Sequence, residues 1–343
     1  MDREWRERAE QEMDQKIKPL RSLGRLESVA VQLAALQQTL EPRVERGRIL
    51  IFAADHGVSA EGVSAYPREV TAQMLLAFAS GGAAITVLGR TLGLAVEVID
   101  VGVDAELPAL PGVVVAKVRR GSRNFLHEPA LAEEELAAAL AAGGAAVRRA
   151  AADGVDTVGL GEMGIGNTTA AAALLSALTG APARETVGRG TGVDDQRLET
   201  KRAVVAAGLA RHAESLAEPR RALAAVGGLE IAALAGAAIE AARLRRAVLV
   251  DGFISTVAAL AAVRLDPAVR DALFFAHRSA EAGHRLALDA LDATPLLDLE
   301  MRLGEGTGSA LAFPILRAAA AILREMATFA QAGVAGKEDP GTP

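Results

Sequence analysis

The residues from Gly161 to Thr169 have a composition that suits the binding of an anion. Their sequence, GEMGIGNTT, follows a short apolar segment and opens a helical stretch. Backbone N–H groups at the start of a helix, together with the helix dipole, attract a phosphate or carboxylate group. The glycine spacing matches neither the dinucleotide pattern G-x-G-x-x-G nor the P-loop. A turn that only packs a helix closely against a strand is the alternative interpretation.

A second glycine-rich loop runs from Gly188 to Gly192 with the sequence GRGTG, and a helix is expected to begin after it near Asp194 or Asp195. This loop is able to close over a phosphate, with the ammonium group of Lys201 as a compact positive charge. A simple flexible connection fits the same residues equally well.

A third glycine cluster places one carboxylate, Glu305, in the sequence LGEGTG that ends at Gly308. Glycines allow the backbone to approach a ligand closely. Burial of the carboxylate would raise its pKa toward neutrality, which suits a general base. The alternative is a glutamate that is favoured at a helix N-terminus by the helix dipole.

Two groups of histidines are candidates for acid–base or metal chemistry. Asp55 and His56 form either an acid–base pair or an ordinary turn at the end of a strand. His277, Glu281 and His284 have the spacing of one helix face, which makes a metal site conceivable. Because the sequence indicates no fourth ligand nearby, we predict no metal site.

Six short apolar segments are predicted to be the strands that position these residues: 49–54, 95–101, 113–118, 155–160, 247–250 and 272–276. Their apolar residues are nearly continuous rather than alternating. This pattern is typical of strands buried on both faces, in a parallel sheet covered by helices.

Alanine-rich helical stretches separate the predicted strands: 70–90, 133–151, 168–178, 195–216, 229–242 and 255–265. Alternating strands and helices predict a doubly wound α/β domain, Rossmann-like, with a mainly parallel sheet of about six strands. Ligands bind at the carboxyl ends of such strands, where Asp55–Gly57, Gly161–Thr169, Asp251–Gly252 and His277–Ser279 are expected.

The two ends of the chain are predicted to be helical. We therefore expect a large Rossmann-like domain over residues 45–284, and a small helical domain built from residues 1–44 and 285–343. The last helix is expected over residues 310–327, bent or broken near Pro314.

Composition excludes several classes of protein. The net charge of −6 and the ten aromatic residues argue against nucleic-acid binding. The absence of cysteine excludes disulfides, thiolate metal sites and a cysteine nucleophile, and it suits a reducing compartment, so a cytoplasmic location is expected. The uncharged runs 70–89 and 163–183 contain polar residues and glycines, which favours buried helices over membrane spans.

Longer stretches of the sequence resemble the nicotinate-nucleotide–dimethylbenzimidazole phosphoribosyltransferases. The resemblance runs in order from about residue 22 to about residue 315. It rests on ADHGV at 54–58, EGVSAYP at 61–67, Gly161–Thr169, GTG at 190–192, GGLEIA at 227–232, DGF at 251–253, HRS at 277–279 and LGEGTG at 303–308. The main departure is Pro19-Leu20-Arg21, where the family commonly has a Pro-Gly pair.

The resemblance implies transfer of the ribose phosphate of nicotinate mononucleotide to 5,6-dimethylbenzimidazole. The products would be α-ribazole 5′-phosphate and nicotinate, in the lower-ligand branch of cobalamin synthesis. It also implies a homodimer, with no nucleic-acid or membrane partner. The pyridinium leaving group of nicotinate mononucleotide is already activated, so neither a metal nor another cofactor is expected.

The resemblance also implies roles for individual residues. Glu305 would be the general base, with Glu162 as a second catalytic carboxylate close by. The benzimidazole pocket would be lined by Ser64, Tyr66 and Gln73. The phosphoribosyl group would be surrounded by Gly164, Gly166, Asn167, Gly190, Lys201 and Ser279, with Asp251 near them.

Two other classes of function remain as alternatives. A nucleotide-dependent dehydrogenase would share the fold, but it should carry the dinucleotide glycine fingerprint, which is missing. A non-catalytic nucleotide-binding module would not need Glu305.

Overall fold

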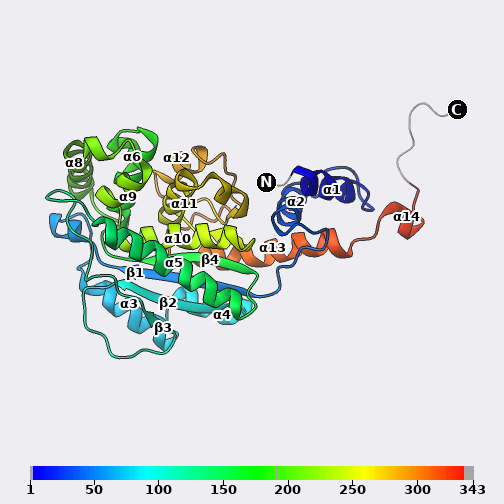
Figure 1. Cartoon of the computed structure of the whole chain (residues 1–343), viewed down its shortest axis with the longest axis horizontal. Coiled ribbons are helices and arrows are strands. Elements are labelled where there is room, and N and C mark those ends of the chain that lie inside the picture. The colour runs from blue at the N-terminus through cyan, green and yellow to red at the C-terminus, as the bar shows by residue number, and fades with distance from the viewer. Residues whose placement is uncertain (1–2, 191, 336–343) are drawn as a thin grey trace. The chain divides into compact units, whose positions relative to one another are not determined.

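The computed structural model describes residues 3–190 and 192–335 and contains one six-stranded sheet (Figure 1). Every strand pairs in parallel with its neighbours, in the order β3-β2-β1-β4-β5-β6. The strands are β1 Gly47–Ala54, β2 Ala95–Gly102, β3 Val113–Val115, β4 Thr157–Met163, β5 Ala247–Val250 and β6 Leu273–Phe275. The predicted α/β fold with a parallel sheet is confirmed.

The strands form where the sequence is continuously apolar because both faces of the sheet are covered. Residues 49–54 of β1 and all four residues of β5 are buried. At the centre of the sheet, Ile51 of β1 lies opposite Val98 on one side and Gly161 on the other. The largest differences from the predicted boundaries are that β3 ends at Val115 rather than residue 118 and that β4 runs on to Met163 rather than residue 160.

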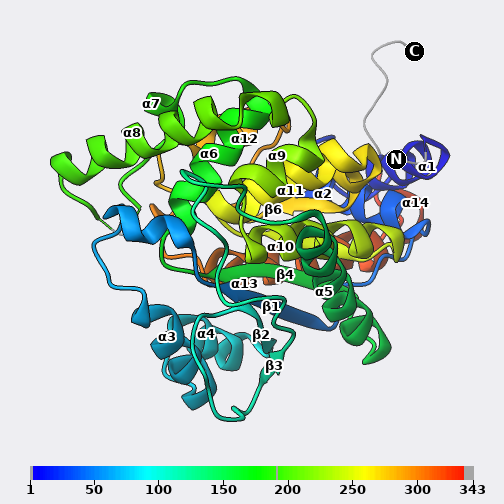
Figure 2. The ribbon, with the colours of Figure 1, turned by 60° about the vertical axis from the view of Figure 1, so that its left-hand side comes forward.

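Helices cover the sheet, and three of them, α5 Glu133–Ala152, α10 Leu229–Arg243 and α11 Phe253–Leu265, lie together (Figures 1 and 2). Helices α3 Glu69–Ser80 and α4 Ala84–Leu92 lie beside β1 and β2, away from α10 and α11. The remaining elements of the larger unit are η1 Gly57–Glu61, α6 Asn167–Thr179, α7 Ala183–Thr186, α8 Asp195–Arg211, η2 Ala213–Ser215, α9 Pro219–Val226, η3 Pro267–Ala272 and α12 His284–Asp289.

The segment predicted as one helix over residues 70–90 is two helices. Gly81 adopts a left-handed conformation, with a φ of 79°, and ends α3. Glu69–Leu92 is long and apolar enough as a whole to suggest a membrane span. However, α3 has 12 residues and is about 18 Å long, against the roughly 30 Å of a bilayer core. The segment is therefore not a single spanning helix.

The chain divides into two compact units, residues 46–312 and residues 1–45 with 313–343. The described elements of the smaller unit are α1 Arg3–Asp14, α2 Arg25–Gln37, the part of α13 from Phe313 onward, and α14 Phe329–Ala332. Helix α13 spans Thr307–Glu325 and continues through Pro314, where the sequence suggested a bend or break.

The larger unit ends at residue 312 rather than at residue 284, the boundary expected from the sequence. The physical reason is that the intervening segment bonds to the end of the sheet. The backbone N–H groups of Leu296 and Leu297 donate to the carbonyl groups of Phe275 and Ala276. These bonds attach residues 285–312 to the strand that precedes them.

Two glycines allow α5 and α10 to cross in close contact. A Cβ atom added to Gly143 would lie 1.8 Å from the carbonyl oxygen of Ala233, and one added to Gly236 would lie 2.0 Å from that of Leu140. Both obstructing atoms belong to helical backbone, which cannot move without separating the helices.

We predict that Gly143→Ala lowers the free energy of unfolding by about 2–3 kcal/mol, because the new methyl group overpacks the helix crossing. The adjacent Gly144→Ala is the matched control. Its Cβ would meet the flexible end of Arg148 at 3.3 Å, so it should be neutral or stabilise by up to about 1 kcal/mol through helix propensity. Chemical denaturation of both variants measures the difference, and equal effects would contradict the account of this crossing.

Candidate active site

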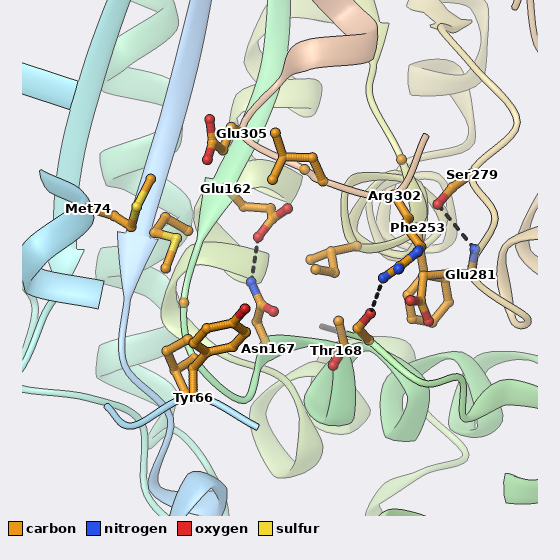
Figure 3. A pocket seen from close by; sticks show the side chains of 18 of the residues that line it. Tyr66, Met74, Glu162, Asn167, Thr168, Phe253, Ser279, Glu281, Arg302 and Glu305 are labelled. Atoms are coloured by element: carbon orange, nitrogen blue, oxygen red, sulfur yellow. Dashed lines mark hydrogen bonds between the residues drawn. The ribbon is translucent and has the colours of Figure 1, made fainter. Parts of the chain in front are cut away.

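A pocket of about 600 Å³ opens at the carboxyl ends of β4, β5 and β6 (Figure 3). This volume is typical of sites for small molecules, which occupy roughly 300–1,000 Å³. Its walls come from the turns after β4, β5 and β6, from residues 302–305, and from the segment that leads into α3. Three of the four turns that the sequence predicted at this edge contribute to the pocket, whereas Asp55–Gly57 does not line it.

Seven of the twelve residues predicted for catalysis or substrate binding line the pocket: Tyr66, Glu162, Gly164, Asn167, Gly190, Ser279 and Glu305. Five others do not line it: Ser64, Gln73, Gly166, Lys201 and Asp251. Gln73 is exposed on α3, whereas Lys201 and Asp251 are buried behind the wall, each 1% exposed. Lys201 and Asp251 therefore affect the pocket through the residues to which they are hydrogen-bonded.

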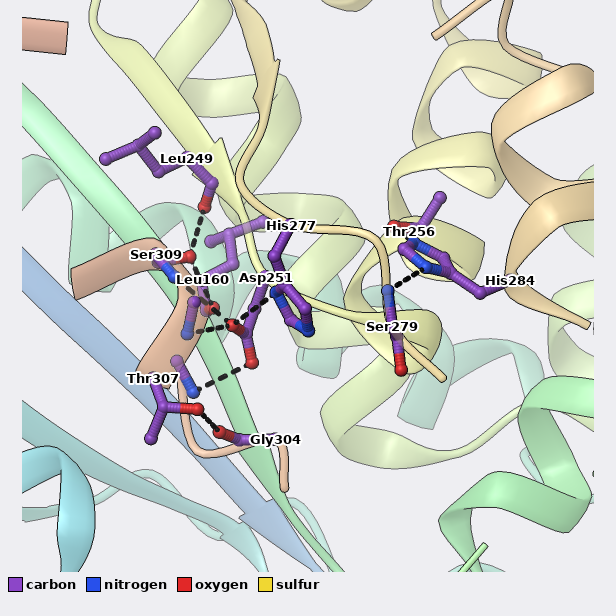
Figure 4. A network of polar contacts seen from close by, with 12 residues as sticks. Leu160, Leu249, Asp251, Thr256, His277, Ser279, His284, Gly304, Thr307 and Ser309 are labelled. Atoms are coloured by element: carbon purple, nitrogen blue, oxygen red, sulfur yellow. Dashed lines mark hydrogen bonds and ion pairs between the residues drawn. The ribbon is translucent and has the colours of Figure 1, made fainter. Parts of the chain in front are cut away.

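Asp251 holds the loop that carries Glu305 (Figure 4). Its Oδ1 atom accepts hydrogen bonds from the backbone N–H groups of Gly308, at 2.6 Å, and Ser309, at 3.2 Å. Its Oδ2 atom accepts from Gly306 at 3.1 Å. The carboxylate thus satisfies donors at the start of α13, where a helix leaves N–H groups without partners.

Glu305 itself lies in an unusual backbone turn. Gly304, Glu305 and Gly306 have φ values of 86°, 62° and 84°, so three successive residues are left-handed. This conformation costs a non-glycine residue about 1–3 kcal/mol, and such strain occurs mainly at functional sites. A Cβ atom on Gly161 would lie 2.6 Å from the carbonyl oxygen of Glu305, so β4 is able to approach this turn only because it has a glycine there.

The electrostatic surroundings of Glu305 suit a proton acceptor. Burial raises the pKa of its carboxyl group, and a hydrogen bond from the backbone N–H of Ile85 in α4 opposes that rise. Its Oε2 atom is buried and has no hydrogen-bond partner in the described structure. One carboxylate oxygen of Glu305 therefore has an unused capacity to accept a hydrogen bond.

Glu162 is the second carboxylate of the pocket, and it lies near Glu305 (Figure 3). Burial and the neighbouring charge of Asp251 raise its pKa to about 8. The side-chain amide of Asn167 donates a hydrogen bond to Oε2 of Glu162. Gly304 must be glycine here, since a Cβ atom would lie 2.3 Å from Oε1 of Glu162.

Lys201 lies behind the opposite side of the pocket. Its Nζ atom donates to Oγ1 of Thr168 at 2.8 Å and to the carbonyl of Gly188 at 3.2 Å. Burial lowers its pKa to about 8, an effect that the nearby charge of Glu281 opposes. Thr168 lines the pocket, so Lys201 orients the hydroxyl group that a ligand would meet.

Arg302 is a pocket residue that the sequence analysis did not single out. It donates from a guanidinium nitrogen to the carbonyl of Gly190 at 3.1 Å, and no ion pair involves it among the described residues. Arg302, Ser279 and Thr168 lie on the side of the pocket away from Glu305 (Figure 3). This side therefore offers a guanidinium group and two hydroxyl groups to an anion.

His284, one of the two histidines that are candidates for a metal site, has other partners, whereas the buried ring nitrogens of His277 have no hydrogen-bond partner in the described part of the chain. The backbone N–H of Ser279 donates to Nδ1 of His284, so Nε2 carries the proton and donates to Oγ1 of Thr256 at 2.9 Å (Figure 4). Burial lowers the pKa of His284 to about 3. Both ring nitrogens of His284 are therefore occupied, and no cluster of potential metal ligands exists within residues 3–190 and 192–335.

His56 does not pair with Asp55, the partner that the sequence suggested. Its Nε2 atom lies 2.6 Å from Oε1 of Glu230, and both side chains are buried. Neither residue lines the pocket. A Cβ atom on Gly166 would lie 3.3 Å from Cβ of His56, so this pair supports the turn after β4 from behind.

The pocket is polarised as a whole. Two carboxyl groups, those of Glu162 and Glu305, lie on the side where the apolar side chain of Met74 and the ring of Tyr66 also line the pocket (Figure 3). The other side carries the guanidinium group of Arg302 and the hydroxyl groups of Thr168 and Ser279, beside the carboxylate of Glu281. Such a pocket suits a ligand with an aromatic ring at one end and a phosphate at the other.

Comparisons with known proteins agree with this geometry. A family model described as "Phosphoribosyltransferase" matches residues 1–334. The chain is 54% identical to the nicotinate-nucleotide–dimethylbenzimidazole phosphoribosyltransferase of Cupriavidus taiwanensis, over 94% of this chain and 93% of the relative. It is 53% identical to that of Pseudomonas aeruginosa PAO1, over 98% and 96% of the two chains.

A solved structure is similar along the whole chain. The crystal structure of CobT from Thermus thermophilus superposes with a TM-score of 0.93 at 51% sequence identity, and the match covers 97% of this chain and 99% of that one.

The raised pKa of Glu162 predicts a pH-dependent stability. Between the ordinary value of 4.5 and about 8, the folded protein holds a proton that the unfolded chain releases, so the free energy of unfolding falls as pH rises through this range. Glu162→Gln keeps an acceptor for Asn167 but removes the titration. We predict that the free energy of unfolding of Glu162→Gln, minus that of the native protein, is higher at pH 8 than at pH 5 by about 1–3 kcal/mol.

Chemical denaturation at the two pH values measures this difference. Glu134→Gln, on the exposed side of α5, is the matched control and should show no such change. If the free energies of unfolding of Glu162→Gln and of the native protein differ by the same amount at both pH values, Glu162 is ionised in the folded protein across this range.

Proposed function

Because the chain belongs to the nicotinate-nucleotide–dimethylbenzimidazole phosphoribosyltransferase family, we propose that its reaction takes place in the polarised pocket. The enzyme transfers the phosphoribosyl group of nicotinate mononucleotide to 5,6-dimethylbenzimidazole in the lower-ligand branch of cobalamin biosynthesis. The products are α-ribazole 5′-phosphate and nicotinate. The observation that carries the site is the placement of Glu162 and Glu305 on one side of the pocket and of Arg302 on the other.

The reaction makes one bond and breaks another at the anomeric carbon of the ribose. One ring nitrogen of dimethylbenzimidazole attacks this carbon, and the bond to the pyridinium nitrogen breaks with its electron pair going to the departing nicotinate. The other benzimidazole nitrogen must lose its proton as the ring becomes cationic. The protein therefore has to align two rings and accept one proton, and alignment alone can lower the barrier by several kcal/mol.

Glu305 is the proposed proton acceptor. Its unpartnered Oε2 atom is available for a hydrogen bond from the benzimidazole N–H. The pKa raised by burial brings the carboxylate closer to neutrality, where a general base works best. The left-handed turn fixes the direction of the side chain without help from the substrate.

Glu162 is proposed to interact with the positive charge of nicotinate mononucleotide. Before substrate binds, its pKa of about 8 keeps it protonated at neutral pH. A pyridinium ring nearby would favour the ionised form. The resulting carboxylate stabilises the cation in the bound state and is able to replace Glu305 in part, through a water molecule.

The 5′-phosphate is proposed to bind at the side of the pocket that carries Arg302. Arg302 offers a guanidinium group, and the hydroxyl groups of Thr168 and Ser279 add two further donors. The N–H groups at the start of α6, close to Gly164 and Asn167, favour the same anion. Lys201 contributes its charge from behind Thr168.

The benzimidazole ring is proposed to lie against Tyr66, Val70 and Met74, which form the apolar wall near Glu305. Ser64 belongs to the same segment, and its hydroxyl group accepts a hydrogen bond from the backbone N–H of Tyr66. It is therefore proposed to shape this wall rather than to touch the ring. Gln73 is exposed in the single chain and would reach a ligand only after a movement of α3.

We propose a homodimer as the functional form in the cytoplasm. Helices α3 and α4 each expose a large apolar side chain. Leu76 of α3 is 43% exposed, and Val87 of α4 is 44% exposed. A second copy of the chain would remove these side chains from water.

The first prediction for the reaction concerns Glu305→Gln. Glutamine keeps the size of the side chain and an acceptor for the N–H of Ile85, but it cannot take the proton. We predict that kcat falls by about 10²–10⁴ with the thermal midpoint unchanged. The rate of α-ribazole phosphate formation, followed by mass spectrometry, measures this loss.

Glu162→Gln is the comparison for this experiment and should lose less, and the double variant should be slower than either single one. Near-native kcat in Glu305→Gln together with a large loss in Glu162→Gln would assign the base to Glu162 instead.

The second prediction concerns the phosphate. Arg302→Gln should raise the KM for nicotinate mononucleotide by about 10- to 100-fold, because a charge-assisted hydrogen bond contributes roughly 1.5–3 kcal/mol. The KM for dimethylbenzimidazole should change by less than about twofold. Steady-state kinetics with each substrate varied in turn separates the two constants. An equal rise in both would show that Arg302 supports the pocket structurally and does not bind the phosphate.

A further inference from the structure

A second pocket of about 390 Å³ lies next to the active site and has no role in the reaction proposed above. The glycine-rich loop after α7 separates the two pockets: Thr168 and Gly190 line the first, whereas Gly188, Arg189 and Gly192 line the second. The bonds from Lys201 to Gly188 and from Arg302 to Gly190 hold this loop in place.

Three guanidinium groups are part of the lining of the second pocket, among small and apolar residues. Arg189, Arg202 and Arg302 all contribute to it, and Glu281 is the carboxylate among the described lining residues. Arg189 and Arg202 also pair with Asp195 at 2.5 Å and Glu199 at 2.6 Å.

Those two carboxylates do not neutralise the pocket. The side chains of Asp195 and Glu199 are 89% and 68% exposed, and neither residue lines the pocket. Exposed ion pairs of this kind contribute only about 0–1 kcal/mol, and each guanidinium group has five N–H donors. An anion inside the pocket would therefore still meet available donors.

One of these donors lacks an acceptor. The Nε atom of Arg202 is buried and has no hydrogen-bond partner in the part of the chain that the structure describes. Leaving such a group unpaired costs roughly 1–3 kcal/mol. An oxygen atom of a bound anion would supply the acceptor.

We propose that this pocket binds a phosphate dianion, either inorganic phosphate or a small phosphate monoester, and that its occupancy weakens the binding of nicotinate mononucleotide. Planar guanidinium forks match phosphate oxygens in pairs. The volume is at the lower end of the usual range for small-molecule pockets, so it suits a small ligand. Arg302 and Glu281 line both pockets, so two bound phosphates would compete for Arg302 across one wall.

The test uses inorganic phosphate as the probe, at constant ionic strength. In the native enzyme, saturating phosphate should raise the KM for nicotinate mononucleotide about fivefold, which is the lower end of typical couplings between sites, without changing the KM for dimethylbenzimidazole. Arg202→Gln should reduce this effect to less than about twofold and leave the activity without phosphate unchanged. Arg197→Gln, on the exposed side of α8, removes the same charge outside both pockets and should behave like the native enzyme.

Inhibition that persists fully in Arg202→Gln would overturn the proposal, because phosphate would then act only in the substrate pocket. Calorimetric titration of phosphate into enzyme saturated with nicotinate mononucleotide gives a readout that does not depend on turnover. Binding to the native protein but not to Arg202→Gln supports the second site, and no binding to the native protein refutes it.

Ribose 5-phosphate in the same titration distinguishes the two sources of the dianion. Tighter Arg202-dependent binding of ribose 5-phosphate than of inorganic phosphate would identify a phosphate monoester as the ligand, and the reverse would identify inorganic phosphate. Binding of ribose 5-phosphate that does not depend on Arg202 would place this compound outside the second pocket.

Discussion

The carboxylate of Asp251 is the contact on which the geometry of the pocket around Glu305 depends. It accepts hydrogen bonds from Gly306, Gly308 and Ser309, and so joins the end of β5 to the start of α13. Oγ of Ser309 extends the connection by donating to the carbonyl of Leu249 in β5. Because these bonds fix the backbone on the C-terminal side of Glu305, they hold the strained turn that presents this residue. In the proposed reaction Asp251 is thus a positioning residue, and its charge also raises the pKa of Glu162.

The strained backbone turn at Glu305 and the burial of the carboxyl groups both contribute to organising this pocket before the substrate binds. The left-handed turn and the buried carboxyl groups both cost stability, and the surrounding close-packed glycines make them possible. Gly161 admits the backbone of Glu305 against β4, and Gly304 leaves room for Glu162. The positively charged substrate would offset part of this cost, because a pyridinium ring favours the ionised form of a carboxyl group held near pKa 8. The site is therefore organised before the substrate arrives, and less has to be ordered when it binds.

The sequence predicted the features that depend on local patterns and missed those that depend on distant partners. Continuous apolar runs were sufficient for all six strands, and glycine-rich turns with polar residues indicated which edge holds the pocket. The break at Gly81 was missed because a left-handed glycine does not interrupt an apolar pattern. The role of Asp251 could not be predicted, because its acceptor contacts lie 55 to 58 residues away in the chain. Arg302 was missed because one arginine among thirty-two carries no signal until the fold places it beside Gly190.

A double-mutant cycle between Asp251 and Glu305 tests the central claim most directly. Asp251→Asn keeps the size of the side chain and one acceptor oxygen, and thermal unfolding shows whether the variant is folded. If Asp251 acts on catalysis through the position of Glu305, Asp251→Asn should lower kcat at least about tenfold in the native background but less than about threefold in the Glu305→Gln background. Losses that multiply in the double variant would contradict the account, because Asp251 would then contribute to the reaction independently of Glu305.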